Sequence, residues 1–348
     1  MLEAEIILEE VNPYETFAAT VENDGRTMYL YMSPLKDESL QPKAVWIQNL
    51  IPAPDETDRE AMKKGMAPLL KKTSTRHPEG LAAAEQKRFG ILWFQEGNGV
   101  AVYIDEKLSA VIPPWSGRDG LFGYSSECIS QDAGTVPLEE KNTGLLERIR
   151  ENEEFWKNRN SPSYWSSYRD SLLEKYEQKF GKHTKYYTLS DRKYPPLAVV
   201  EFNSDDKVIY ATLGMSYQNM PAVELSTKLP DEHVRSEIIT ARSSETEWMP
   251  GLMGRIAVYP WLFNRWLGDG HTYESGLTQP FTDFILTKDY GKNFLEKPAD
   301  FEFENRQVNF LLAIPIHQED SLVIKARGIP HVLKRIREKA QPVYRWPL

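Results

Sequence analysis

The chain of 348 residues contains a single cysteine, Cys128, so no intramolecular disulfide can form. A lone unpaired thiol is typical of proteins from reducing compartments, and we therefore expect a cytoplasmic protein. The stretch Gly-Tyr-Ser-Ser-Glu-Cys-Ile-Ser around Cys128 holds no histidine. This favours a buried, inert thiol over a catalytic Cys–His pair.

Motifs of metal and nucleotide chemistry are also missing. None of the six histidines lies three to five residues from another, and neither HExxH nor CxxC occurs. The chain has no GxxxxGK[ST] or GxGxxG loop for a phosphate and no GxSxG nucleophile elbow. We therefore expect no metal site and no cofactor.

Long apolar runs and excess positive charge are absent as well. The most apolar stretch, residues 310–316, is far shorter than the roughly 18 residues of a membrane span, and the acidic first 15 residues do not resemble a signal peptide. We expect no membrane partner. The formal net charge of −9 argues against a nucleic-acid surface, which needs a basic footprint.

Aromatic residues are plentiful, with nine tryptophans and 17 tyrosines. These side chains bring large contact area and a polar handle, so they suit both a core and a protein interface. A charged fraction of 27% and a hydrophobic fraction of 41% are ordinary for a globular chain, and the length favours two domains.

The first predicted domain, residues 1–142, is α+β. Strand-like runs at 17–23, 27–35 and 43–51 are separated by turn signals. Residues 55–82 are helical in composition although Gly65 and Pro68 interrupt them, and two strands at 89–97 and 99–115 flank a Gly97-Asn98-Gly99 turn. Residues 116–143 read as a long loop packed on the domain.

The second predicted domain, residues 143–348, begins with two helices. Ser161 can cap the second helix, and Trp165, Tyr168, Leu172, Tyr176 and Phe180 form its apolar stripe. Further predicted strands are 185–191, 197–203, 207–216, 223–229, 281–288 and 308–316, and 235–243 is a strand for which a helix is the alternative. Helices are predicted at 248–266, with a kink or restart at Pro260, and at 318–340, where Gly328 and Pro330 can divide the helix. The fold class is therefore α+β, with two mixed layered domains.

The most unusual local sequence is Trp261-Leu-Phe-Asn-Arg-Trp266, followed by Gly268-Asp-Gly-His271. Trp261, Phe263, Trp266, Asp269 and His271 are the candidate contact residues for a protein partner. Asp269 beside His271 also admits a second hypothesis, a general base of a hydrolase or transferase. The alternative is a structural turn, in which the glycines supply positive φ and Asp269 accepts backbone N–H groups.

The order of features from about residue 187 onward resembles the suppressor-of-fused family, which occurs in animals and widely in bacteria. The resemblance depends on Tyr-Ala-Thr-Leu-Gly-Met-Ser at 210–216, on the Gly-His-Thr segment within 268–281, and on Val308–Asp320 before a terminal helix. Residues 90–117 and 123–128 look like a segment that precedes this domain in some bacterial members.

This resemblance implies a mixed α/β fold that clasps a segment of a partner protein. It further implies a sequestering or inhibitory role, such as that of a bacterial immunity protein that neutralises a toxin. A basic partner, toxin or regulator, would suit the acidic chain. A hydrolase or transferase centred on Asp269 and His271, and a structural assembly module, remain as alternatives.

Overall fold

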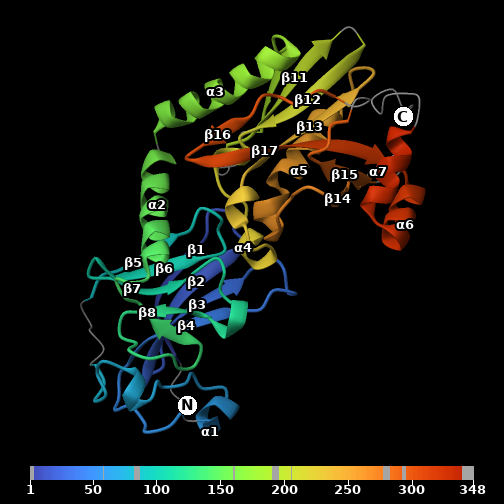
Figure 1. Ribbon diagram of the computed structural model, residues 1–348. Coiled ribbons are helices and arrows are strands. Elements are labelled where there is room, and N and C mark those ends of the chain that lie inside the picture. Colours follow the sequence, from blue (N-terminus) through green and yellow to red (C-terminus); the bar gives the residue numbers. More distant parts are fainter. Residues whose placement is uncertain are drawn as a thin grey trace. The chain divides into compact units, whose positions relative to one another are not determined.

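The computed structural model describes residues 4–57, 59–81, 87–159, 161–189, 196–204, 206–276, 283–291 and 295–338 (Figure 1). The chain divides into two compact units. The first comprises residues 1–160 with the short segments 224–226 and 261–264, and the second comprises the remainder. The two units are defined by contacts within the fold, and the domain boundary that the sequence predicts after residue 142 stays a prediction.

Both units are α+β, as the sequence predicts. The strands of the first unit are β1 (Glu5–Val11), β2 (Phe17–Asn23), β3 (Thr27–Pro34), β4 (Lys43–Asn49), β5 (Phe89–Trp93), β6 (Val100–Ile104), β7 (Lys107–Ile112), β8 (Gly123–Ser125) and β9 (Thr135–Pro137). Those of the second are β10 (Lys185–Thr188), β11 (Ala198–Ser204), β12 (Lys207–Leu213), β13 (Ser236–Arg242), β14 (His271–Glu274), β15 (Asp283–Thr287), β16 (Phe301–Phe303) and β17 (Arg306–Ile316). The α-helices within the described ranges are α1 (Arg59–Lys63), α2 (Thr143–Arg159), α3 (Pro162–Phe180), α4 (Val223–Ser226), α5 (Met249–Phe263), α6 (Gln318–Arg327) and α7 (Ile329–Arg337).

The first unit is built on two sheets, with strand orders β1-β2-β3-β4 and β5-β6-β7-β8-β9. Their apolar faces share one core, which includes Val21 and Leu30 from one sheet and Val102 and Ile112 from the other. Side chains alternate between the two faces of a strand, so Ala101 and Val111 point away from this core. They pack instead with Leu145 and Ile149 of α2, and the five-stranded sheet is thereby covered on both faces.

The second unit contains an eight-stranded sheet in the order β10-β11-β12-β13-β17-β15-β14, with β16 paired to one end of β17. All pairs are antiparallel except β13 with β17, which run parallel. Every residue of β13 is buried, and β12 and β17 pair with its two edges. Helix α3 lies along this sheet (Figure 1), and its stripe Tyr168, Leu172 and Tyr176 is buried as predicted.

Several local predictions need correction. The run 223–229 is predicted as a strand, but its residues 223–226 form the short helix α4, which follows Ala222 in the left-handed region at φ 62°. The predicted strand over 99–115 is a hairpin of β6 and β7, because Asp105 and Glu106 both adopt positive φ at the turn. In the described part of the charged segment 55–82, the helical elements are the short α1 and a 3₁₀ turn at Lys72–Ser74, and Gly65, two residues after α1, has φ 77°.

The helical predictions near the C-terminal end agree better with the structure. Helix α5 continues for three residues beyond Pro260. The predicted helix over 318–340 is divided at Gly328, and its residues 339–340 lie outside the described ranges. Ser161 stands at the N-cap of α3, but its hydroxyl bonds to Ser163 and does not cap the helix.

Candidate functional site

The candidate contact residues Trp261 and Phe263 differ in accessibility, although both lie in the last turn of α5. Trp261 is 2% exposed, whereas Phe263 is 52% exposed. Trp261 is therefore a buried residue that a partner reaches only if the chain opens, while Phe263 presents its ring to solvent.

Trp266 and His271 pack against each other in the second unit. Their ring centroids are 4.3 Å apart, and the His271 Nδ1 lies 3.2 Å from the backbone oxygen of Trp266. A Cβ on Gly268 would overlap the indole ring of Trp266, so a larger residue at that position requires the indole to move. Burial lowers the pKa of His271, against the opposing effects of the Trp266 carbonyl and of Asp269.

Asp269 accepts a hydrogen bond from the backbone N–H of Lys288 at 2.8 Å, which ties the turn to the end of β15. His271 begins strand β14 and pairs with Leu286. Both side chains are thus held by backbone groups near their own turn, which supports the structural interpretation and gives no support to a general base. Residues 277–281 of the motif that the sequence singles out lie outside the described part of the chain.

A buried carboxylate that the sequence analysis missed lies at the centre of the second unit. Glu237 of β13 accepts hydrogen bonds from Tyr168 Oη at 2.8 Å and Thr212 Oγ1 at 2.6 Å. It also accepts from the backbone N–H of Gly214 at 3.1 Å and from both the N–H and the hydroxyl of Ser216 at 2.8 Å. Burial raises the pKa of Glu237, and these hydrogen bonds oppose the rise.

Arg235, two residues before Glu237, is also fully buried. Its guanidinium donates to Asn219 Oδ1 at 3.1 Å and to the Ser216 carbonyl at 3.0 Å, and it pairs with Glu304. It also lies 4.9 Å from the ring centre of Phe303. Both charged groups therefore have internal partners, and they hold the loop after β12 in place. The available sequence signal was a pair of charged residues two apart, one just before and one inside a strand with an apolar centre.

Cys128 is buried, as predicted, and its Sγ lies 3.1 Å from the backbone oxygen of Ser130. Burial raises the pKa of the thiol to about 11. Because the thiolate is the nucleophile, this environment favours an inert cysteine.

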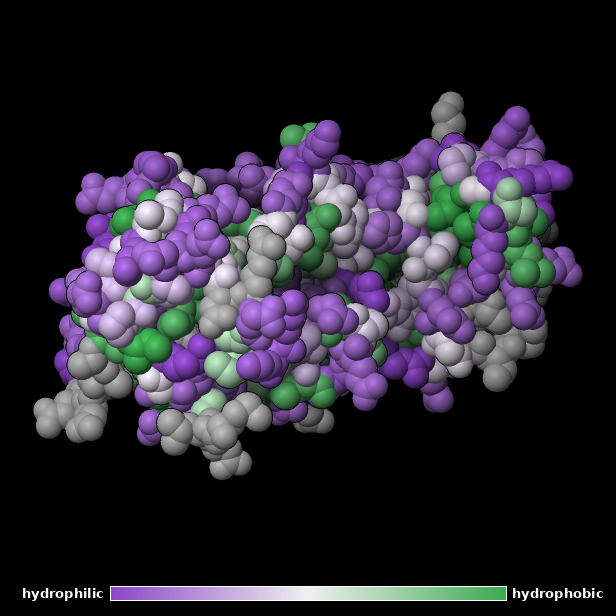
Figure 2. Space-filling model, turned by 90° about the horizontal axis from the view of Figure 1, so that it is seen from below, coloured by the Kyte–Doolittle hydropathy of each residue, from purple (hydrophilic) through white to green (hydrophobic). Residues whose placement is uncertain are grey.

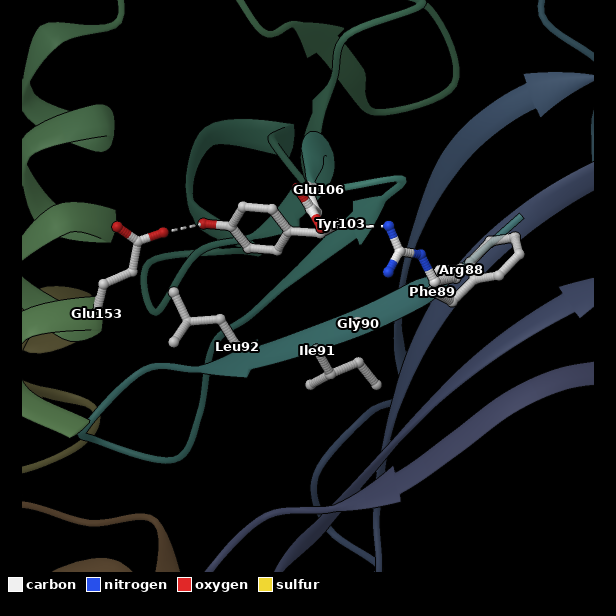
Figure 3. Close-up of a pocket in the computed structure, with 8 residues that line it drawn as sticks. All are labelled: Arg88, Phe89, Gly90, Ile91, Leu92, Tyr103, Glu106 and Glu153. Carbon is white, nitrogen blue, oxygen red and sulfur yellow. Dashed lines mark hydrogen bonds and ion pairs between the residues drawn. The ribbon is translucent and has the colours of Figure 1, made fainter. Parts of the chain in front are cut away.

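A pocket of about 380 Å³ lies beside β5 in the first unit (Figure 3). It is lined by Arg88, Phe89, Gly90, Ile91, Leu92, Tyr103, Glu106 and Glu153. Tyr103 Oη donates to Glu153 Oε1 of α2 at 2.6 Å, and Arg88 pairs with Glu106 at 3.3 Å. Burial and the bond to Glu153 raise the pKa of Tyr103, which keeps its hydroxyl protonated as a donor.

No group of three or more His, Cys, Asp or Glu side chains with metal-binding geometry occurs among the described residues. In the same part of the chain, no helix is long and apolar enough to cross a membrane.

Comparison with known families identifies a segment of the second unit. Residues 193–345 match the family model described as suppressor of fused protein. This segment is a suppressor-of-fused domain. The match confirms the resemblance inferred from the order of motifs, and it covers β11 to α7 of the second unit.

Two solved structures are similar to the chain at low sequence identity. A suppressor-of-fused homolog from Neisseria gonorrhoeae is 16% identical, with 53% of this chain and 100% of that chain covered and a TM-score of 0.39. A chain of the Sufu–Fu complex is 11% identical, with 49% and 84% covered and the same TM-score of 0.39. No curated protein matches the chain.

Proposed function

We propose that the protein works by binding another protein, which it sequesters or inhibits. The observation that carries this proposal is the suppressor-of-fused domain over residues 193–345. One solved relative is the Sufu–Fu complex, in which a protein of this family is bound to a partner.

The chemistry of the second unit supports binding over catalysis. Glu237 and Arg235 are fully buried and extensively hydrogen-bonded. Glu237 accepts hydrogen bonds from Tyr168 and Ser216, and Arg235 pairs with Glu304. A catalytic acid or base must exchange a proton with a substrate, and groups so enclosed serve instead to fix a loop. On the face that Figure 2 shows, apolar residues lie in small patches separated by hydrophilic ones.

The candidate contact residues from the sequence remain part of this proposal. Phe263 offers an exposed ring, and Trp266 is a half-buried one beside His271 and Asp269, while Trp261 is buried. Because the chain is acidic, a basic partner would associate faster with it. An immunity protein that neutralises a basic toxin in the cytoplasm is the specific form of the function that we propose.

Affinity capture with the tagged full chain from a lysate of the source organism tests this function. We expect one protein to be enriched by the wild type, and at least a tenfold lower yield with Phe263→Ala or with Trp266→Ala. Leu322→Ala is the matched control, because Leu322 is 62% exposed on α6 and lies outside the candidate residues.

If the captured partner is a toxin, its expression should arrest growth and co-expression of this chain should restore it. Absence of any enriched protein, or turnover of a small molecule that depends on Asp269 or His271, would contradict the proposal.

A further inference from the structure

Strand β5 ends the five-stranded sheet, and no strand in the described part of the chain pairs with its outer edge. The Asp105 N–H donates to the Arg88 carbonyl, and the Phe94 N–H donates to the Gly99 carbonyl. The peptide groups of Arg88 and Phe94, at the two ends of β5, therefore face the partner strand β6. Because the hydrogen bonds of an antiparallel strand alternate in direction, the peptide groups of Phe89, Ile91 and Trp93 point outward.

The two ends of this edge differ. The Trp93 carbonyl accepts a hydrogen bond from Trp156 Nε1 of α2 at 2.6 Å, and the Gln95 N–H donates to Asn152 Oδ1 at 2.6 Å. Helix α2 therefore closes the edge from Trp93 onward. The outward peptide groups of Phe89 and Ile91 have no partner among the described residues, and β5 has neither a proline nor a charged residue to block pairing.

The pocket beside β5 includes this edge. Phe89 and Ile91 point to one face of the strand, and Gly90 and Leu92 point to the other, yet all four line the same pocket (Figure 3). The lining thus includes residues whose side chains point to both faces of the strand, beside the edge that no described strand pairs with. Gly90 adds space, because a Cβ built there would have no neighbour within 4 Å.

The charges at the pocket favour a cation. Its charged lining residues are Arg88, Glu106 and Glu153, and Arg88 is already paired with Glu106. Glu153 uses Oε1 to accept from Tyr103, and Oε2 has no partner among the described residues. Leu92 and the ring of Tyr103 suit the aliphatic stem of a lysine, whose ammonium could then reach Glu153.

We propose that β5 is a docking edge for an extended segment of another protein, which pairs with Phe89 and Ile91 and places a lysine in the pocket beside Glu153. Main-chain hydrogen bonds supply the affinity in this mode of recognition, and the side-chain pocket supplies the specificity. The inference depends on the proposed function only in that the occupant is a protein segment.

Synthetic peptides test this surface directly. The probe is acetyl-Thr-Val-Lys-Val-Thr-Val-amide, compared with versions that carry methionine or glutamate in place of lysine and with one N-methylated at alternate amides. Amide chemical shifts of the labelled full chain report the site and the affinity. We expect shifts at Phe89 to Leu92, the tightest binding for the lysine peptide, and at least tenfold weaker binding after N-methylation.

Two variants separate the contributions of backbone and charge. Ile91→Pro removes one outward N–H without removing a bond to β6, and should weaken all peptides at least tenfold, whereas Ile91→Val should have little effect. Glu153→Gln keeps an acceptor for Tyr103 and should weaken the lysine peptide about threefold but not the methionine peptide. Glu154→Gln is the matched control, because Glu154 is exposed on the same helix.

Equal binding of the N-methylated peptide, or no binding at millimolar concentration, would overturn the proposal even if a partner is captured through the suppressor-of-fused domain. If the protein is a dimer in solution and Ile91→Pro dissociates it, the proposal is also overturned, because β5 then pairs with a second copy of this chain. Conversely, peptide binding at β5 with no captured partner would leave this inference standing while the proposed function failed.

Discussion

Tyr168 of α3 donates a hydrogen bond of 2.8 Å to Glu237 of β13, and so joins a helix to a fully buried strand of the second sheet. The same carboxylate accepts from Gly214 and Ser216 in the loop after β12. One side chain thus fixes a helix, a strand and a loop, and most of the predictions below concern it or its neighbours.

Replacement of Glu237 should separate the need for an acceptor from the need for a charge. Glu237→Ala leaves the donors of Tyr168, Gly214 and Ser216 buried without a partner, and we expect a loss of about 3 kcal/mol or more in the free energy of unfolding. Glu237→Gln retains the oxygen that receives these donors, and its amide can donate to Thr212 Oγ1. We expect it to change stability by less than about 1 kcal/mol. Urea unfolding of both variants measures the difference, and equal losses would contradict this account.

The raised pKa of Glu237 predicts a pH dependence of stability opposite to that of a carboxylate whose pKa is lowered by an ion pair. The folded state binds the proton more tightly than the unfolded state, where the pKa is near its usual value of 4.5. The stabilising contribution is therefore fully present below pH 4.5 and is lost as pH rises from there through the folded pKa. The stability of the wild type relative to Glu237→Gln should fall across that range. A difference that stays constant or grows with pH would refute the assignment.

Arg235 should be sensitive to a substitution that keeps its charge. Arg235→Lys preserves one cation but cannot reach Asn219, the Ser216 carbonyl and Glu304 together, because lysine lacks the planar fork of arginine. We expect a loss of about 2–4 kcal/mol in unfolding free energy. Arg255→Lys on the exposed side of α5 is the control and should lie within about 0.5 kcal/mol of the wild type. A loss at Arg235 as small as the control's would show that the network is not needed for stability.

Two glycines should respond to alanine in opposite directions. A Cβ at Gly268 would overlap the Trp266 ring, and we expect Gly268→Ala to destabilise the fold by about 1–3 kcal/mol and to change the fluorescence of the packed indole. A Cβ at Gly251 in α5 meets nothing within 4 Å. Gly251→Ala should therefore raise stability by about 0.4–1 kcal/mol. Thermal melts of the two variants check both signs.

The sequence predicts those elements whose patterning is local. Helix α3 has apolar residues at intervals of three and four between Ser161 and Gly181, and it forms over residues 162–180. Strands β2 and β3 alternate or run apolar between turn residues and appear where expected. The β6–β7 hairpin was missed because Asp105 and Glu106 are not the glycine or asparagine that usually mark positive φ.

The site was harder to predict because its determinants are distant in sequence. Nothing near Arg235 indicates that Glu304, 69 residues later, will pair with it, and nothing near Gly90 indicates that Glu153 of α2 lies at the same pocket. The Gly268–His271 turn was singled out by composition, and the structure gives its polar groups backbone partners. Unusual local composition thus located a turn, whereas the buried polar cluster and the open edge of β5 became visible only in three dimensions.

The parallel pairing of β13 with β17 has a consequence for how the protein is made. Ser236 of β13 aligns with Asn309 of β17, and Ile239 aligns with Leu312. About 70 residues must therefore be synthesised after β13 before its partner strand β17 exists. Until β17 leaves the ribosome, the apolar strands β13 and β15 lack the neighbour that separates them in the finished sheet. The nascent second unit must therefore wait with exposed strand edges, which are the surfaces that aggregate or recruit chaperones, while the hairpins of the first unit can already close.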